Sequence, residues 1–142
     1  MQLGHTLEKT FLIVSPRHAV HAHRSIAAQG IKARVDAIWL ATEPMDMRAG
    51  TETALARVVA VFGAAKPHCA YLFANRRANR MKVLVHDGVG IWLAARRLNQ
   101  GKFHWPGIHR GTEVELDPEQ LQALVLGLPW QRVGAGGAIT LL

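Results

Sequence analysis

The sequence predicts an α+β fold: an antiparallel β-meander of about four or five strands packed against one helix, plus a C-terminal helix. Three observations predict it. Residues 80–86 alternate between two faces, as the residues of a strand do. Asp87-Gly88 then gives a strong hairpin signal. Residues 51–62 carry apolar side chains at helical spacing. A chain of 142 residues suits a single domain.

The domain is expected to begin near residue 35. Residues 1–34 show no sustained period and are expected to form a poorly ordered N-terminal extension. Within them, His18, His21 and His23 have no cysteine or carboxylate at ligand spacing, so we expect no metal site. A single domain is expected over 35–128, and the Gly-rich residues 129–142 are expected to form a flexible tail.

The first predicted strand is a short apolar stretch from Val35 to Leu40, closed by Thr42-Glu43-Pro44. A helix follows over 51–62, with Glu52 in its first turn and Gly63 as its stop. Arg48 would lie just before this helix, where the free N–H groups and the dipole favour an anion. The alternative is that Arg48 merely pairs with Asp46.

The meander is predicted from strands at 69–74, 80–86 and 91–98, with a short fourth strand that includes Phe103 and Trp105. Nothing between these strands is long enough for a parallel crossover. One face of the sheet should pack on the helix and the other should face water. Residues 112–116 are expected to add an edge strand, and Asp117-Pro118 should open the last helix as N-cap and first helical residue.

The charge of the chain, +7 at neutral pH, is concentrated in a quarter of its length. Residues 69–105 hold seven basic side chains against one acidic, whereas the other 105 residues hold ten and nine. Apolar residues alternate with these charges, so the segment should fold, unlike a disordered basic tail. A folded basic surface favours nucleic acid as partner. The alternative is a solvated charged face with no ligand.

Arginine and lysine bind phosphates, and the planar arginine fork matches two phosphate oxygens. The candidate nucleic-acid-binding residues are Arg48, Arg76, Arg77, Arg80, Lys82, Arg96, Arg97 and Lys102. Three aromatic residues among them, Trp92, Phe103 and Trp105, could stack on bases or contact a partner protein. Aromatic residues of a small sheet are nonetheless more often part of the core.

Catalysis is not expected. A two-metal site needs converging carboxylates, and the candidates would be Asp46, Asp87 and one of Glu113 or Glu115. Asp87 already has a role in the turn. No motif requires an enzyme or a cofactor. The lone Cys69 excludes an internal disulfide, and no apolar run approaches a membrane span, so a cytoplasmic protein is expected.

Several of these motifs occur together in one known family. The chain resembles the accessory protein of insertion sequence 66 elements, called TnpB or the second-frame protein, which is distinct from the RNA-guided nuclease of that name. The resemblance covers about residues 35–128, and Ala49, His86 and Asn99 depart from the family pattern. It is carried by Asp46-Met47-Arg48, Asn75-Arg76-Arg77, Lys82, Asp87-Gly88 with Gly90, Trp92-Leu93, Arg97-Leu98, Gly101, Phe103 and Trp105-Pro106.

The resemblance implies a bacterial role in DNA transposition beside a separate catalytic transposase. The leading hypothesis is a non-enzymatic accessory factor that holds DNA by its phosphate backbone on a basic sheet face. The first alternative is a module that docks on the transposase without binding DNA. The second is a metal-dependent nuclease. The sequence leaves the oligomeric state and the DNA recognised open.

Overall fold

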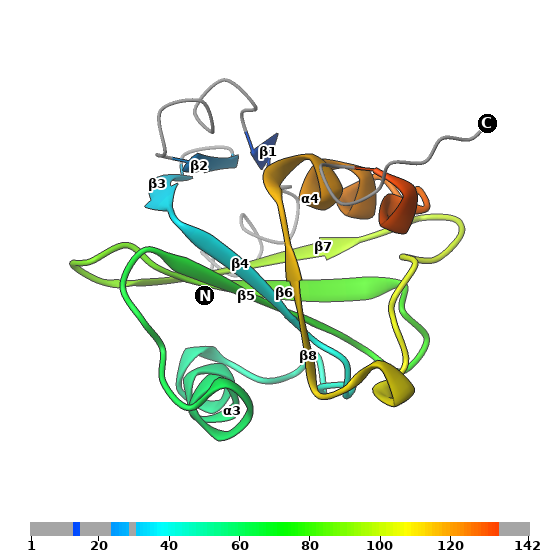
Figure 1. Ribbon diagram of the computed structural model, residues 1–142. Coiled ribbons are helices and arrows are strands. Elements are labelled where there is room, and N and C mark those ends of the chain that lie inside the picture. The colour runs from blue at the N-terminus through cyan, green and yellow to red at the C-terminus, as the bar shows by residue number, and fades with distance from the viewer. Residues whose placement is uncertain (1–12, 15–23, 29–30, 134–142) are drawn as a thin grey trace.

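The computed structural model describes residues 13–14, 24–28 and 31–133, and its centre is a five-stranded sheet with the strand order β7-β6-β5-β4-β8 (Figure 1). This confirms the predicted α+β class. The strands are β4 (Ala37–Ala41), β5 (Cys69–Ala74), β6 (Arg80–His86), β7 (Ile91–Arg97) and β8 (Glu113–Leu116). The helices are α3 (Thr51–Phe62) and α4 (Pro118–Val125), with the 3-10 turns η1 (Ile108–Arg110) and η2 (Trp130–Arg132).

The sheet is a meander only over β5, β6 and β7, which are antiparallel neighbours. β4 and β5 run parallel, because α3 lies in the connection between them and forms a crossover. β8 then pairs antiparallel with β4 and forms one edge. The predicted strand around Phe103 and Trp105 is absent, since these residues form an irregular loop that crosses the end of the sheet.

Both faces of the sheet are covered, so the prediction of one face in water was wrong. Met81, Val83 and Val85 of β6 point to the cluster beneath α4, which also holds Phe103 and Trp130. Leu84, between them in sequence, points to the opposite cluster beneath α3. The alternation of β6 is therefore as predicted, and the second face is closed by the C-terminal part of the chain, as Figure 1 shows.

α3 ends and α4 begins where their terminal residues predict. Gly63 ends α3 with a φ of 90°, a conformation that glycine adopts readily, and its N–H donates to the Val59 carbonyl. Asp117 caps α4 by accepting from the Gln120 N–H, and the Gln120 side chain accepts in return from the Asp117 N–H. This capping box fixes where α4 starts.

Part of the predicted N-terminal extension is described, and it forms strands. β1 (Ile13–Val14), β2 (Arg24–Ala28) and β3 (Ile31–Val35) make a separate antiparallel sheet. The histidines at 18, 21 and 23 lie outside the described residues.

The packed unit continues past the predicted boundary at residue 128. Trp130 is only 3% exposed, and its indole N–H donates to the His104 carbonyl at 2.6 Å. Among the described residues, no helix has the length and apolar character needed to cross a bilayer.

Candidate nucleic-acid interface

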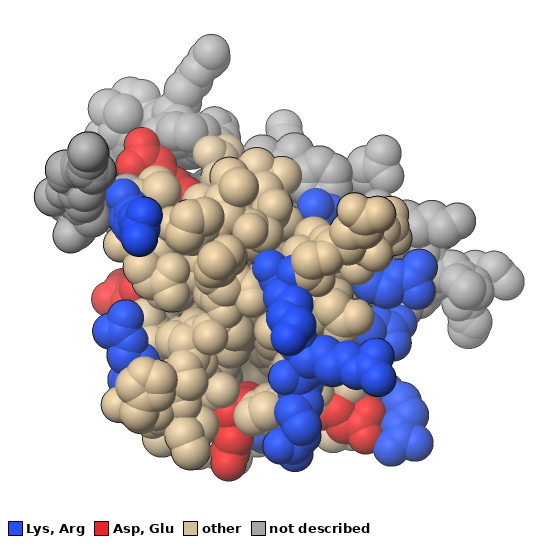
Figure 2. Space-filling model, turned by 90° about the vertical axis from the view of Figure 1, so that its right-hand side faces the viewer, with Lys and Arg blue, Asp and Glu red and all other residues tan. Residues whose placement is uncertain are grey.

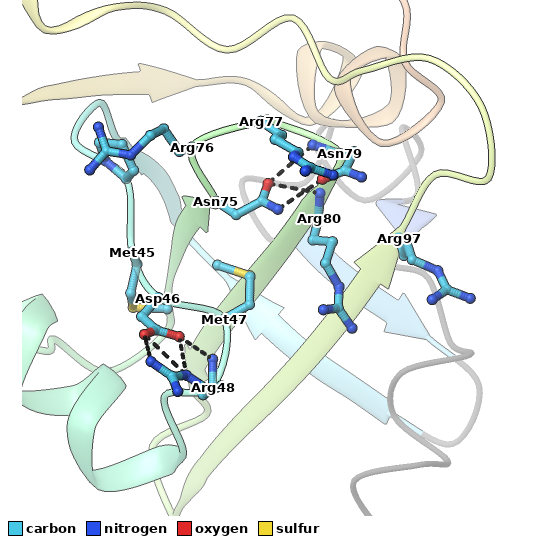
Figure 3. Close-up of a pocket in the computed structure, with 11 residues that line it drawn as sticks. Met45, Asp46, Met47, Arg48, Asn75, Arg76, Arg77, Asn79, Arg80 and Arg97 are labelled. Carbon is cyan, nitrogen blue, oxygen red and sulfur yellow. Dashed lines mark hydrogen bonds and ion pairs between the residues drawn. The ribbon is translucent and has the colours of Figure 1, made fainter.

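Three segments meet at one end of the sheet and enclose an open cavity of about 660 Å³ (Figure 3). They are the loop before α3, the turn between β5 and β6, and the adjoining ends of β6 and β7. A backbone hydrogen bond from Met45 N–H to the Ala74 carbonyl ties the first two together at 2.9 Å. The cavity, which we call the basic groove, is lined by Pro44, Met45, Asp46, Met47, Arg48, Asn75, Arg76, Arg77, Asn79, Arg80 and Arg97.

The turn between β5 and β6 is organised by Asn75. Its Oδ1 accepts from the backbone N–H groups of Asn79 and Arg80, each at 3.1 Å. Its Nδ2 donates to Asn79 Oδ1 at 2.8 Å (Figure 3). These bonds close the turn and leave Arg76 and Arg77 exposed at its tip.

Arg80 and Arg97 lie directly opposite each other on β6 and β7, and both line the groove. Like charges at directly opposed positions of an antiparallel pair destabilise the sheet. Arg97 is exposed and forms no ion pair with any residue that the structure describes. A bound anion would offset the repulsion between the two guanidinium groups.

Arg48 is paired with Asp46, as the alternative reading of the sequence expected. Arg48 Nη2 lies 2.7 Å from Asp46 Oδ2, and its Nε lies 3.1 Å from Oδ1 (Figure 3). The side-chain hydrogen bond from Arg48 lowers the pKa of the Asp46 carboxyl to about 2, and the same bond raises the pKa of Arg48. Both side chains are mostly exposed, so the pair contributes little to stability. It does compensate the charge of Arg48 locally.

Lys82 and Arg96 each donate a hydrogen bond that ties the sheet to a neighbouring segment beside the groove. Lys82 Nζ donates to the Ala49 carbonyl at 2.7 Å and so fixes the loop before α3. Arg96 Nε donates to the Val125 carbonyl at 2.6 Å and fixes the end of α4, and its burial lowers its pKa. A second, smaller cavity of about 300 Å³ is lined by both residues. Arg80 and Arg97 line this cavity and the groove alike.

Lys102 lines neither of the two cavities, but it lies close to the groove. Phe103 N–H donates to the carbonyl of Ala78 at 2.7 Å, which places the exposed Lys102 beside the turn that carries Arg77. Figure 2 shows several lysine and arginine side chains clustered on the right-hand part of the face in view, with others at its left-hand edge. The predicted basic residues therefore converge, though at one end of the sheet and not across an open sheet face.

The three candidate aromatic residues belong to the fold. Phe103 is 2% exposed, so it is not available to stack on a base. The Trp105 indole N–H donates to the Ala41 carbonyl at 2.8 Å, and the Trp92 indole N–H donates to Asp87 at 2.9 Å. Backbone N–H groups of Gly90 and Val89, followed by Trp92, lower the pKa of Asp87. These contacts correct the stacking prediction for Phe103 and place both tryptophans against the core.

The acidic residues do not converge. Asp46 lies beside the start of β6 and Asp87 follows its end, and a strand of that length spans about 23 Å. Glu113 and Glu115 lie on the far edge strand, β8. Among the described residues, no three His, Cys, Asp or Glu side chains are placed to hold a metal ion. This arrangement contradicts the nuclease alternative, which needed them together.

Four residues that shape the groove were not predicted as site residues from the sequence. Asn75 and Asn79 fix the turn, while Met45 and Met47 supply apolar lining. An Asn four residues from another Asn, on either side of two arginines, is a signal for such a turn, because Asn side chains bond nearby backbone groups. The methionines gave no comparable signal.

The chain is similar to known proteins over most of its described length. Residues 36–135 match the family described as IS66 Orf2 like protein. Two uncharacterized proteins of Sinorhizobium fredii (strain NBRC 101917 / NGR234) are similar to it. One, y4jC, is 35% identical over 98 residues, which are 68% of this chain and 82% of the relative. The other, y4hO, is 33% identical over 95 residues, which are 66% of this chain and 82% of the relative. No solved structure matches the chain.

Proposed function

Because the chain belongs to the IS66 Orf2-like family, which suggests an accessory role in transposition, we propose that it binds DNA in the basic groove and so assists a separate transposase. The membership confirms the resemblance seen in the sequence. The family is one of accessory proteins and is not known for enzymes. DNA binding itself is our inference from the charges and geometry of the groove.

The observation that supports DNA binding most strongly is the opposed pair Arg80 and Arg97, which both line the groove. Like charges at directly opposed positions are unfavourable in a sheet, and Arg76 and Arg77 extend from the adjacent turn. Phosphate oxygens would bind between the guanidinium forks through charge-assisted hydrogen bonds. Such contacts fix the register of a protein on DNA without reading its sequence.

The eight candidate residues divide into two groups by their contacts. Arg76, Arg77, Arg97 and Lys102 are exposed and are the proposed phosphate ligands, together with Arg80, which is half-buried and lines the groove. Arg48 joins them only when it exchanges Asp46 for a phosphate. Lys82 and Arg96 act by positioning, since their side chains anchor α3 and α4 to the sheet.

Salt dependence of DNA binding tests the proposal. Each lost phosphate contact lowers the slope of log K against log salt by about 0.9 on duplex DNA. The variant Arg76→Ala/Arg77→Ala/Arg97→Ala should therefore bind more weakly and have a slope smaller by about 2 to 3. The matched control removes three exposed charges elsewhere, Lys66→Ala/Arg110→Ala/Arg132→Ala, and should keep most of the slope. Equal slopes for the two variants would contradict binding in the groove.

The alternative function is a module that docks on the transposase without binding DNA. It rested on an anchor patch of Trp92, Trp105 and neighbouring arginine side chains, and both indole N–H groups are bonded within the fold. The packing of the two tryptophans therefore favours the DNA-binding proposal. Capture of the transposase that survives nuclease treatment, together with no shift of DNA, would favour docking instead.

A further inference from the structure

β7 is an edge of the central sheet, and no strand that the structure describes lies on its other side. It is seven residues long and contains neither proline nor glycine. Its pairing with β6 is continuous, without a bulge. Proteins usually shield long edges with proline, bulges or very short strands, because an open edge can pair with another chain. β8, at the opposite edge, is only four residues long.

The register of the hairpin shows which backbone groups of β7 face outward. Asp87 N–H donates to the Gly90 carbonyl at one end, and Leu98 N–H donates to the Asn79 carbonyl at the other. Bonded and non-bonded pairs alternate along an antiparallel ladder. Trp92, Ala94 and Arg96 therefore bond to β6. The residues whose N–H and C=O groups face away from β6 are Ile91, Leu93, Ala95 and Arg97.

We propose that β7 pairs antiparallel with β7 of a second copy of this chain, with Ala94 at the centre. This register uses the whole strand and joins two five-stranded sheets into one. Each outward-facing residue meets an outward-facing residue of the other copy, so every N–H finds a carbonyl. Such a contact is isologous and closes on itself as a two-fold dimer.

The side chains of β7 suit this register. Arg97 lies opposite Ile91 of the partner subunit, and Leu93 lies opposite Ala95 of the partner subunit, so no arginine faces another. Arg96 lies opposite Trp92 of the partner subunit, in the closer type of antiparallel pair. A guanidinium beside an indole face is an attractive pair. The antiparallel register thus separates the arginines of the two copies, whereas a parallel, in-register pairing would align like charges.

An exposed apolar patch lies beside the same edge. The bond from Arg96 to the Val125 carbonyl brings the end of α4 against β7. Leu126 and Leu128, which follow directly, are 57% and 50% exposed. On the α4 side of the joined sheets these leucines would be covered by the second copy, which supplies apolar burial beside the backbone pairing.

The two-fold axis of such a pair runs perpendicular to the sheet. Both copies therefore present their α3 faces on the same side of the joined sheet, and both basic grooves open on that side. Because each groove lies at the C-terminal end of its own β7, the grooves lie at opposite ends of the shared strand pair. The dimer itself needs no DNA, so it can be tested apart from the proposed function.

Sedimentation equilibrium of nuclease-treated protein tests the dimer. The wild-type chain should approach twice its 15.6 kDa mass at high micromolar concentration. Added salt should preserve or strengthen the association, because it screens repulsion between two chains of charge +7. Association through residual nucleic acid would weaken with salt instead. A wild-type chain that stays monomeric throughout would overturn the proposal.

Proline substitutions in the two edge strands test whether the dimer interface lies at β7. Ala95→Pro removes one outward N–H and leaves the ladder to β6 intact, so it should weaken dimerisation at least about tenfold. Glu115→Pro is the matched control, since the bond from Thr42 N–H to the Thr112 carbonyl places the Glu115 N–H outward on β8. It should dimerise as the wild type does. Equal dimerisation of the Ala95→Pro variant would exclude β7.

Hydrogen exchange of the wild-type chain provides a test that does not depend on how the variants fold. The amides of Leu93 and Ala95 should exchange rapidly in dilute protein and slow as the concentration rises. The amides of Trp92 and Ala94, already bonded to β6, should change far less. Concentration-independent exchange at Leu93 and Ala95 would overturn the proposal.

Discussion

Asp46 is the acidic residue among the side chains that line the basic groove. It holds Arg48 through hydrogen bonds of 2.7 and 3.1 Å, and it contributes a negative charge where we propose that phosphate binds. A DNA phosphate must therefore compete with a carboxylate for Arg48. If DNA binds in the groove as proposed, Asp46 lowers the affinity of the groove for it.

Replacing Asp46 by Asn should increase DNA affinity, because the variant loses a repelling charge and releases Arg48. We expect a fall in Kd of about threefold or more at low salt, with a smaller gain at high salt. Fluorescence anisotropy with a labelled duplex measures both. Glu119→Gln, in α4 on the other face of the sheet, removes the same charge at a distance and is the control. A weaker-binding Asp46→Asn variant would contradict this role.

The pKa of Asp46 predicts how this effect depends on pH. Since the folded pKa is lowered to about 2, the carboxylate stays ionised above that value, and its pairing with Arg48 is lost only as the pH falls through about 2. The ratio of the Asp46→Asn and wild-type affinities should therefore be constant between pH 5 and 8. A ratio that changed between pH 5 and 8 would contradict an Asp46 carboxylate that stays ionised over this range.

At the level of single residues, the sequence could predict which side chains carry charge but not what each one meets. Alternation placed Lys82 on the face opposite Met81 and Val83, as the structure shows, but it did not indicate which helix covers that face. Its partner, the Ala49 carbonyl, depends on how α3 docks, which no local pattern encodes. The same holds for Arg96 and the Val125 carbonyl.

The turn between β5 and β6 is the element that presents Arg76 and Arg77. Asn75→Ala removes two accepted hydrogen bonds and one donated bond, so we expect the free energy of unfolding to fall by about 1–3 kcal/mol. DNA affinity should fall as well, because both arginines lose their fixed position. Denaturant unfolding and anisotropy measure the two effects.

Asp117→Ala provides a control matched in stability. Loss of the capping box should lower the free energy of unfolding by about 0.5–2 kcal/mol. Its DNA affinity should stay at the wild-type value, because α4 covers the face of the sheet opposite α3. Parallel losses of affinity in both variants would mean that general stability, and not the turn, sets binding.

Elements defined by local signals could be predicted, and those defined by distant contacts could not. The limits of α3 agree with the prediction because Gly63 and the apolar spacing are local features. The parallel pairing of β4 with β5 was missed, since it depends on the crossover through α3. The loop around Phe103 and Trp105 has a strand-like sequence but no neighbouring strand.

At the scale of the whole molecule, the basic residues of one sequence segment gather at one end of one sheet. The sequence predicted their concentration within residues 69–105. It could not predict that Arg80 and Arg97 would lie directly opposite each other, which the register of β6 and β7 decides. It also could not predict that α4 and Trp130 would cover the second face and leave the end of the sheet as the basic surface.

The most direct test of DNA binding in the basic groove is an NMR titration of the arginine Nε–H resonances with a short DNA duplex. Binding of DNA in the groove predicts that the resonances of Arg76, Arg77, Arg80 and Arg97 shift together and saturably. The resonances of Arg57 and Arg110 should not shift. Arg57 is held by the Pro44 carbonyl and Glu43, and Arg110 lies on η1. Shifts spread evenly over all of these arginines, or confined to residues outside the groove, would contradict DNA binding in the groove.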